Sequence, residues 1–435
     1  MTREELLLLI ENYLQDHTDK KEFIPGVTQI PVSGAIVSDE DILGVIDTAL
    51  DKWFTEGKKC TVFAKKLSEF FDKPYCLLTN SGSSASLVAM TVMARKAKKS
   101  RFILTSALAF PTTIAPIYQN NLIPFFVDVN IKDLSPDLNQ IEEVLNSTDI
   151  AGAIFTHTLG FPYKENKLYE LFGDEKFIIS DGCDAFGANV PVIHDDYVSY
   201  YPVGTFSDAL TLSFFPAHQI FSSGEGGAVL FSNKEDYEVG RSLISWGRAC
   251  RCKPGQDNVC GKRFSYTNQG TLPDGYDHKY IFERLGYNLK MIELQAAMGI
   301  TQFAKIDEFI KKRKDNVVKL LYALSDSKYL KFINIIYLNS SSPFGFPIFV
   351  KQDAPFSANE LINYLESVKI RTRRFFAGNI IRQPGFHSYP RMNKDLSTTD
   401  YIMNNGLWIG CYPGITDEMI DYMADKIKEF ESRYK

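Results

Sequence analysis

PYCLLTNSGSSASLVAMTVMARKA, residues 74–97, is the stretch on which the fold prediction rests. A short apolar run, typical of a buried strand, ends in a Ser/Gly turn and passes directly into a run of helical length. The same alternation continues along the chain at residues 101–108, 112–121, 123–130, 151–157, 176–187, 209–215 and 227–233. Strands that alternate with helices predict an α/β fold, in which a mainly parallel central sheet is flanked by helices on both faces.

Before residue 74 and after residue 233, the sequence no longer shows this regular alternation of strands and helices. Residues 1–48 are polar and helical in pattern, and we predict a separate N-terminal segment there. Residues 49–315 form the predicted large domain, which includes an irregular, cysteine-rich loop at 247–263. A long helical pattern starts near Ile292, and the last part of the chain mixes helix and strand. We therefore expect residues 316–435 to form a smaller α+β domain.

Composition excludes several classes of protein. The 435 residues include 48 basic and 53 acidic side chains, a net charge of −5, which argues against a dedicated nucleic-acid binder. With 45% hydrophobic residues the chain can bury a large core, so disorder is excluded as its main state. No apolar run reaches the ~18–20 residues of a membrane span, and the start, MTREELLLLIENY, is typical of an amphipathic helix. We expect a cytoplasmic protein without membrane or nucleic-acid partners.

Two turns could hold an anionic, flat ligand. Asn80 to Ala85 places Gly82 and Ser83 at a predicted helix start, where free N–H groups and hydroxyls favour an anion. A turn that only caps the helix is equally compatible with this pattern. Phe110 follows a predicted strand and could stack on a flat ring, although it could equally be a core residue.

A third site combines carboxylates with a cysteine at the end of a predicted buried strand. Asp181-Gly182-Cys183-Asp184 places a carboxylate where it needs a cationic or donor partner, and a protonated pyridine nitrogen is one such partner. A loop-anchoring Asp is the alternative. Cys183 would also complete a set of four thiolates with three loop cysteines, Cys250, Cys252 and Cys260. Four thiolates suit a [2Fe–2S] cluster or a structural zinc, and the spacing alone does not choose between them.

The order of these motifs resembles a known family. Ser213-Phe-Phe-Pro-Ala-His218 and Gly224-Glu-Gly-Gly227 complete the series, together with the stretches at 81–84, 156–160, 286–290 and 293–297. The sequence from about residue 60 onward resembles the DegT/DnrJ/EryC1/StrS sugar aminotransferases. This resemblance implies a fold type I, pyridoxal-phosphate-dependent transferase-like architecture.

The departure from that family is informative. Where the aminotransferases carry the lysine that binds the cofactor covalently, this chain has His218, and no lysine lies between Lys176 and Lys234. A histidine cannot form a stable imine, but it can move a proton. With the cysteine loop, this resembles the pyridoxamine-phosphate and [2Fe–2S]-dependent hexose 3-dehydratases, most closely those acting on CDP-4-keto-6-deoxy-D-glucose. Such enzymes serve 3,6-dideoxyhexose pathways of lipopolysaccharide O-antigens.

The resemblance implies a role for each residue. His218 is the base that acts on the pyridoxamine 5'-phosphate (PMP) bound to a nucleotide-linked 4-keto-6-deoxyhexose, whose C3 hydroxyl is expelled. The remaining cofactor-binding residues are Gly82, Ser83, Phe110, Asp181, Asp184, Ser213 and, from the other subunit of a homodimer, Asn288. Cys183, Cys250, Cys252 and Cys260 hold a [2Fe–2S] cluster, which takes electrons from a flavin/iron–sulfur reductase.

Two alternatives remain open. A cluster-free dehydratase of the colitose type shares the histidine without the cysteine loop, and a sugar-nucleotide-binding relative could have kept the fold without catalysis. Arg371, Arg373 and Arg374 are candidates for contacts to the nucleotide diphosphate, although they could equally form a solvated face. The segment at 188–208 is longer than expected for this family.

Overall fold

The computed structural model describes residues 1–17, 22–265, 267 and 270–434. Its centre is an eight-stranded sheet in which seven strands run in the same direction and β9 is antiparallel to its neighbours β1 and β8. The prediction of a mainly parallel sheet is therefore confirmed. In spatial order the strands are β1 (Tyr75–Thr79), β9 (Gly227–Phe231), β8 (Ala209–Ser213), β5 (Phe177–Asp181), β4 (Gly152–Thr156), β2 (Phe102–Ser106), β3 (Ile123–Val127) and β13 (Met392–Asn393).

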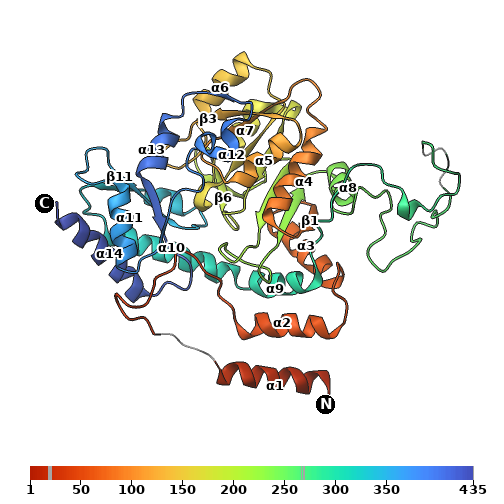
Figure 1. Cartoon of the computed structure of the whole chain (residues 1–435), viewed down its shortest axis with the longest axis horizontal. Helices are drawn as coiled ribbons and strands as arrows, with labels where there is room; N and C mark the ends of the chain where they lie inside the picture. The colour runs from red at the N-terminus through yellow and green to blue at the C-terminus, as the bar shows by residue number, and fades with distance from the viewer. Residues whose placement is uncertain (18–21, 266, 268–269, 435) are drawn as a thin grey trace.

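Helices cover both faces of this sheet, as the alternation predicts (Figure 1). Successive strand residues point to opposite faces, so Leu77 packs with one set of helices and Leu78 with the other. Leu77 shares its core with residues of α4 (Gly82–Ala94), α5 (Pro111–Gln119) and α8 (Lys234–Leu243). Leu78 shares its core with α3 (Lys58–Phe70), α9 (Glu293–Phe303) and α10 (Ile306–Ala323), and α6 (Leu138–Ser147) and α7 (Glu165–Phe172) cover the rest of that face.

Among its described residues, the N-terminal segment contains two helices. α2 (Asp39–Leu50) packs against α9, and buried Asp41 anchors it through Lys305 at 2.6 Å and Thr301. α1 (Arg3–Asp16) lies alongside α2 at the edge of the molecule, where Arg3 contacts Asp47 and Asp51 at 2.7 Å (Figure 1). The predicted segment 1–48 thus covers α1 and most of α2.

The C-terminal part builds a second, antiparallel sheet. Its four strands are β10 (Leu330–Phe332), β11 (Phe346–Val350), β14 (Gly406–Ile409) and β12 (Thr372–Arg373), covered by α11 (Ala358–Ser367), α13 (Ser397–Asn405) and α14 (Asp417–Ser432). This agrees with the α+β character predicted for the small domain. α10 runs through the predicted boundary at 315, and β13 returns to extend the large sheet beside β3.

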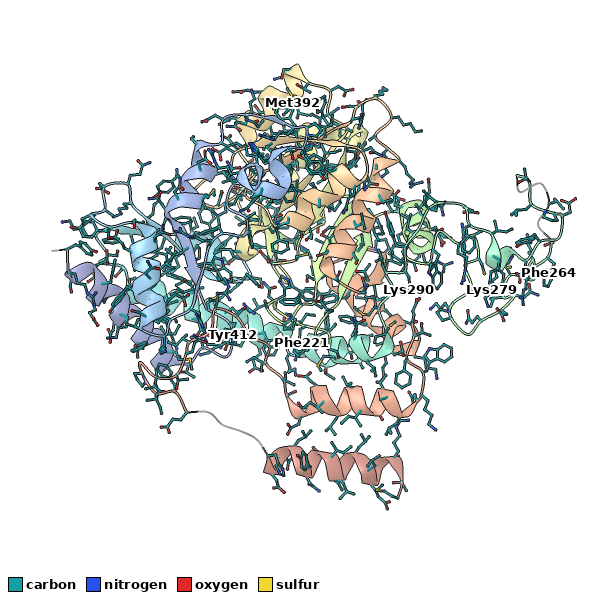
Figure 2. The ribbon with its side chains drawn as sticks, viewed as in Figure 1. Phe221, Phe264, Lys279, Lys290, Met392 and Tyr412 are labelled. Carbon is teal, nitrogen blue, oxygen red and sulfur yellow. The ribbon has the colours of Figure 1, made fainter. Side chains whose placement is uncertain are left out.

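Two irregular regions leave the large domain. The longer segment flagged at 188–208 contains a hairpin of β6 (Asn189–Ile193) and β7 (Val198–Pro202). The region between α8 and α9, which contains the cysteine-rich loop, has one 3-10 turn, η3 (His278–Tyr280), among its described residues. It projects from the body on the right of Figure 2, where Phe264 lies in its outer part. Short elements elsewhere are η1 (Thr158–Gly160), η2 (Gly173–Glu175), η4 (Ile335–Leu338), η5 (Ile380–Arg382) and α12 (Pro384–His387).

Candidate active site

The carboxyl ends of the parallel strands meet at one edge of the sheet, and a cavity of about 960 Å³ lies there. Ligands of α/β proteins bind at this edge because the loops that follow parallel strands converge on it. The small domain closes the cavity from the other side with Phe344, Arg373 and Trp408. Of the predicted site residues, Gly82, Ser83, Phe110, Asp181, Cys183, Asp184, Ser213 and His218 all line this cavity.

The Ser/Gly turn at the start of α4 has the geometry of an anion cradle. Ser81 is the N-cap, and its hydroxyl accepts the N–H of Ser84 at 3.1 Å, so Gly82 and Ser83 present the positive end of the helix to the cavity. A Cβ on Gly82 would lie 2.5 Å from the Cβ of Ser213. Because the missing side chain lets β8 approach the helix start, Ser213 and Ser83 can face the same anion.

Asp181 is a buried carboxylate at the end of β5, with 4% of its surface exposed. Its oxygens accept hydrogen bonds from Thr113 Oγ1 at 2.6 Å, Thr211 Oγ1 at 3.3 Å and the Cys183 N–H at 3.2 Å. Within the described part of the chain it forms no salt bridge. A carboxylate buried among neutral donors in a cavity wall suits a cationic ring N–H of a ligand.

His218 follows β8 in a turn whose position is fixed from both sides. Its backbone carbonyl accepts from the buried Arg313 guanidinium at 3.2 Å, and its ring packs on Phe344 with centroids 5.2 Å apart. Burial, aided by the charge of Arg313, lowers the pKa of His218 to about 3. The imidazole is therefore neutral at ordinary pH, and its buried Nδ1 makes no hydrogen bond within the described chain.

Asp184 lies 3.6 Å from His218 Nδ1, and its other oxygen accepts the Leu159 N–H at 3.3 Å. Burial and the charge of Asp181 raise the pKa of Asp184 to about 8. Near neutral pH, the protonated carboxyl group of Asp184 thus lies beside the neutral imidazole of His218. This pair can keep or move a proton inside the cavity.

Phe110 is 51% exposed although it caps α5 at the cavity wall. An aromatic side chain that could be a core residue is instead left open on a wall beside Asp181, which favours ring stacking by a ligand. None of the described residues that line this cavity is a lysine.

The loop cysteines are brought together in a different place. A sulfur of Cys250, a sulfur of Cys252 and a ring nitrogen of His278 all lie within 4.8 Å of one another, whereas Cys183 lines the main cavity. Cys260 accepts the N–H of Lys262 at 3.4 Å. Burial and the neighbouring Cys252 and Cys260 thiols raise the pKa of Cys250. The structure thus fits a metal centre in the loop, but it does not join Cys183 to that centre within one chain.

Asn288 is exposed and does not line the cavity of its own chain. Its side-chain oxygen accepts from Lys290 at 2.8 Å. Arg373 and Arg374 reach the cavity wall, whereas Arg371 pairs with Glu366 at 2.8 Å on the surface. Sequence reasoning missed the three threonines around Asp181, namely Thr113, Thr156 and Thr211, because nothing in the sequence links segments that are up to 68 residues apart.

Comparison with known proteins now decides the family. Residues 36–428 match the DegT/DnrJ/EryC1/StrS aminotransferase family. This chain belongs to that family. As a member of the DegT/DnrJ/EryC1/StrS family, it is 39% identical to lipopolysaccharide biosynthesis protein RfbH of Salmonella typhimurium over 98% of both chains. It is also 38% identical to dTDP-4-dehydro-2,6-dideoxy-D-glucose 3-dehydratase of Saccharopolyspora spinosa, covering 99% of this chain and 92% of that one.

The fold of this family member is also similar to that of a solved structure. The crystal structure of GDP-4-keto-6-deoxymannose-3-dehydratase with bound GDP-perosamine superposes with a TM-score of 0.79 and 24% identity, over 92% of this chain and 100% of that chain. The fold type I transferase-like architecture expected from the sequence is therefore confirmed. Among the described helices, none combines the length and the apolar character that a membrane span requires.

Proposed function

We propose that the protein removes the C3 hydroxyl of a nucleotide-linked 4-keto-6-deoxyhexose, with PMP as cofactor and CDP as the nucleotide. The observation that carries the proposal is His218, a neutral histidine in a lysine-free wall opposite an anion cradle and a buried carboxylate. The relatives support it: one is named as a sugar 3-dehydratase and another as a lipopolysaccharide biosynthesis protein. The pathway proposed is accordingly 3,6-dideoxyhexose and O-antigen biosynthesis.

The residues of the cavity fit PMP. When bound, PMP supplies an amine that condenses with a ketone and a protonated ring that takes up electrons. The helix start at Gly82 and Ser83, with Ser213, would hold the phosphate, and Phe110 would stack on the ring. Asp181 would accept the ring N–H and keep that nitrogen protonated, which the absence of a salt bridge within the described chain favours.

His218 supplies the proton acceptor. A lysine at this position would bind the cofactor covalently. A histidine does not, so the amine of the cofactor stays free to react with the sugar. Its imidazole has a lone pair because burial keeps it neutral. A phosphate-bearing ligand brings negative charge into the cavity, and this charge favours the protonated imidazole that results. Asp184 lies 3.6 Å from Nδ1, on the side of the ring where it can orient the imidazole.

The product of C3 dehydration needs two electrons to become a 3-deoxy sugar. We propose that the cysteine loop holds a [2Fe–2S] cluster, on the implied ligands Cys183, Cys250, Cys252 and Cys260, and that a flavin/iron–sulfur reductase is the partner. Three of these four cysteines lie in one loop of the chain. Asn288, exposed and outside its own cavity, supports a homodimer in which the second copy supplies this residue.

Absorption of the anaerobically purified protein, with iron and zinc analysis, tests the cluster. Visible charge-transfer bands and about two irons per chain are expected. A colourless protein with zinc or no metal would instead favour the cluster-free dehydratase. Turnover of CDP-, dTDP- and GDP-linked 4-keto-6-deoxyhexoses, compared by kcat/KM, tests the nucleotide, and a preference other than CDP would replace that part of the proposal.

Hydrogen exchange at the cofactor methylene tests the base. In D₂O, with PMP and substrate, the wild type should introduce deuterium at this carbon and the His218→Asn variant should not. His194→Asn is the matched control because His194 is an exposed histidine in the β6–β7 hairpin, where it stacks on Tyr197. Exchange retained by His218→Asn would show that another group is the base.

A further inference from the structure

Helix α10 carries a cation on its buried face. Ile306 and Phe309 pack into the core on one face of the large sheet, and Val317 and Leu320 pack into the core of the small domain. These positions recur every three or four residues, so they mark one side of the helix. Figure 1 shows α10 between α9 and the helices of the small domain. Arg313 lies on this buried side, between the two cores, and only 1% of its surface is exposed.

The guanidinium of Arg313 bonds to backbone carbonyls from both domains. One terminal nitrogen donates to the carbonyls of Pro343 and Phe344, and the other donates to the carbonyl of His218, all at 3.2 Å. Within the described part of the chain Arg313 forms no salt bridge, and its Nε has no partner. An ionised group buried without a countercharge is costly, so stability alone does not account for an arginine here.

An arginine can join these segments because its donors form a rigid fork. The guanidinium is planar, always protonated and donates in several fixed directions, whereas a lysine is a single point charge on a flexible stem. The fork of Arg313 therefore holds the turn at His218 and the segment at 343–344 at one fixed spacing. Across this spacing the imidazole of His218 packs on the ring of Phe344, with ring centroids 5.2 Å apart.

The segment at 342–344 is itself docked on the end of the large sheet. The Ser342 N–H donates to the carbonyl of Gly160 at 2.9 Å, and the Ser342 carbonyl leaves no room for a Cβ on Gly160, whose φ is +82°. Gln219, which follows the proposed base, donates from its side chain to the Ser342 carbonyl at 2.9 Å. The segment leads into β11, an inner strand of the small sheet. The place of the proposed base is thus tied to the docking of the small domain.

We infer that Arg313 is a positioning residue for His218, because it ties the turn that carries the imidazole to the small-domain segment that carries Phe344. His218 is the base only under the proposed function, on which this assignment therefore rests. Phe344 is also part of the wall with which the small domain closes the cavity. The same contact therefore completes the cavity wall and aligns the base.

Replacement of Arg313 tests the assignment in the full-length protein with PMP and substrate. Arg313→Lys keeps the positive charge but loses the fork, and Arg313→Met loses both. Because misplacement of a reacting group by about 1 Å can cost about 100-fold in rate, deuterium exchange at the cofactor methylene should slow about 10- to 100-fold in both variants. The Kd for PMP should stay within about twofold of the wild type, since Arg313 does not line the cavity. If Arg313→Met does not fold, Arg313→Lys decides.

Asn316→Ala is the matched control. Asn316 lies one turn further along the buried side of α10, is fully buried, and donates to the carbonyls of Cys411 and Tyr412 at 3.2 Å. It thus anchors the small domain through backbone carbonyls, as Arg313 does, but its bonds do not reach His218. The control should lose stability in urea unfolding and keep the wild-type exchange rate.

NMR of the histidine rings gives a readout that does not depend on turnover. The chain has six histidines, and His218→Asn identifies the ring signal of His218. The ring current of Phe344 shifts this signal in the wild type, because the two rings pack together. The signal should move in both Arg313 variants and stay in place in Asn316→Ala.

Three results would overturn the assignment. These are wild-type exchange and a wild-type His218 signal in the Arg313 variants, an Asn316→Ala variant that slows exchange as strongly as they do, or a moved signal with unchanged exchange. Failure of the proposed function looks different, because His218→Asn would then keep the exchange. In that case a His218 signal that moves only in the Arg313 variants would still show that Arg313 holds the ring in place.

Discussion

The substitution Asp181→Asn should weaken the binding of PMP more than it lowers the stability of the folded protein. The side chain is buried and accepts hydrogen bonds from Thr113 Oγ1, Thr211 Oγ1 and the Cys183 N–H. Asparagine keeps the shape and one acceptor oxygen. The threonine hydroxyls can rotate to accept from its NH₂ group, so most of the local network can be rebuilt.

The expected effects differ in size. In the folded protein, the substitution replaces charge-assisted hydrogen bonds by neutral ones. This should lower the free energy of unfolding by about 1 kcal/mol. PMP binding loses the hydrogen bond between the carboxylate and the ring N–H. A hydrogen bond to a charged group contributes about 1.5–3 kcal/mol, which corresponds to a Kd for PMP about 10- to 100-fold weaker. The affinity should therefore fall much more than the stability.

Calorimetric titration of the purified protein with PMP, together with urea unfolding, measures both quantities. Asp208→Asn is the matched control, because Asp208 precedes β8 at the opposite edge of the sheet, where it accepts the Ile178 N–H at 2.9 Å and pairs with Lys96. This control should lose stability and keep its PMP affinity. A Kd for Asp181→Asn within twofold of the wild type would refute the assignment of Asp181 to the ring nitrogen.

Two further predictions concern the cavity walls. Gly82→Ala would place a Cβ 2.5 Å from the Cβ of Ser213. Overpacking of this kind costs about 1–3 kcal/mol, and it should weaken binding of PMP and of inorganic phosphate together in calorimetric titrations. Gly44→Ala on α2, whose nearest neighbour is the Thr301 methyl at 3.2 Å, is the control, and equal phosphate affinity in both variants would contradict the cradle. Asp184→Asn tests the raised pKa in the protein without cofactor. Between pH 4 and pH 8 the unfolded wild type releases the Asp184 proton and the folded protein keeps it, so wild-type stability falls relative to the variant as pH rises, by up to about 1.4 kcal/mol per pH unit. Urea unfolding across this range measures the difference, and a constant difference would mean that Asp184 ionises normally in the folded protein.

Local patterns gave the strands, the helices and the edge of the sheet that carries the site. Apolar runs of strand length at 75–79, 102–106 and 177–181 and the helical runs between them are set by neighbouring residues, so a short window is enough to read them. The direction of the strands then places every strand-end motif at one edge. This is why Gly82, Phe110, Asp181 and His218, predicted from separate stretches, line a single cavity.

The sequence by itself therefore determined the fold class, the family and a set of residues that line the candidate site. Only the tertiary structure surrounded Asp181 with threonines from α5, β4 and β8, closed the cavity with Phe344 and Trp408, and returned β13 to the large sheet. It also placed His278 near Cys250 and Cys252, and Cys183 in the wall of the main cavity. Contacts of this kind join residues far apart in the chain, and they depend on the path of the whole backbone, which no local spacing of residues encodes.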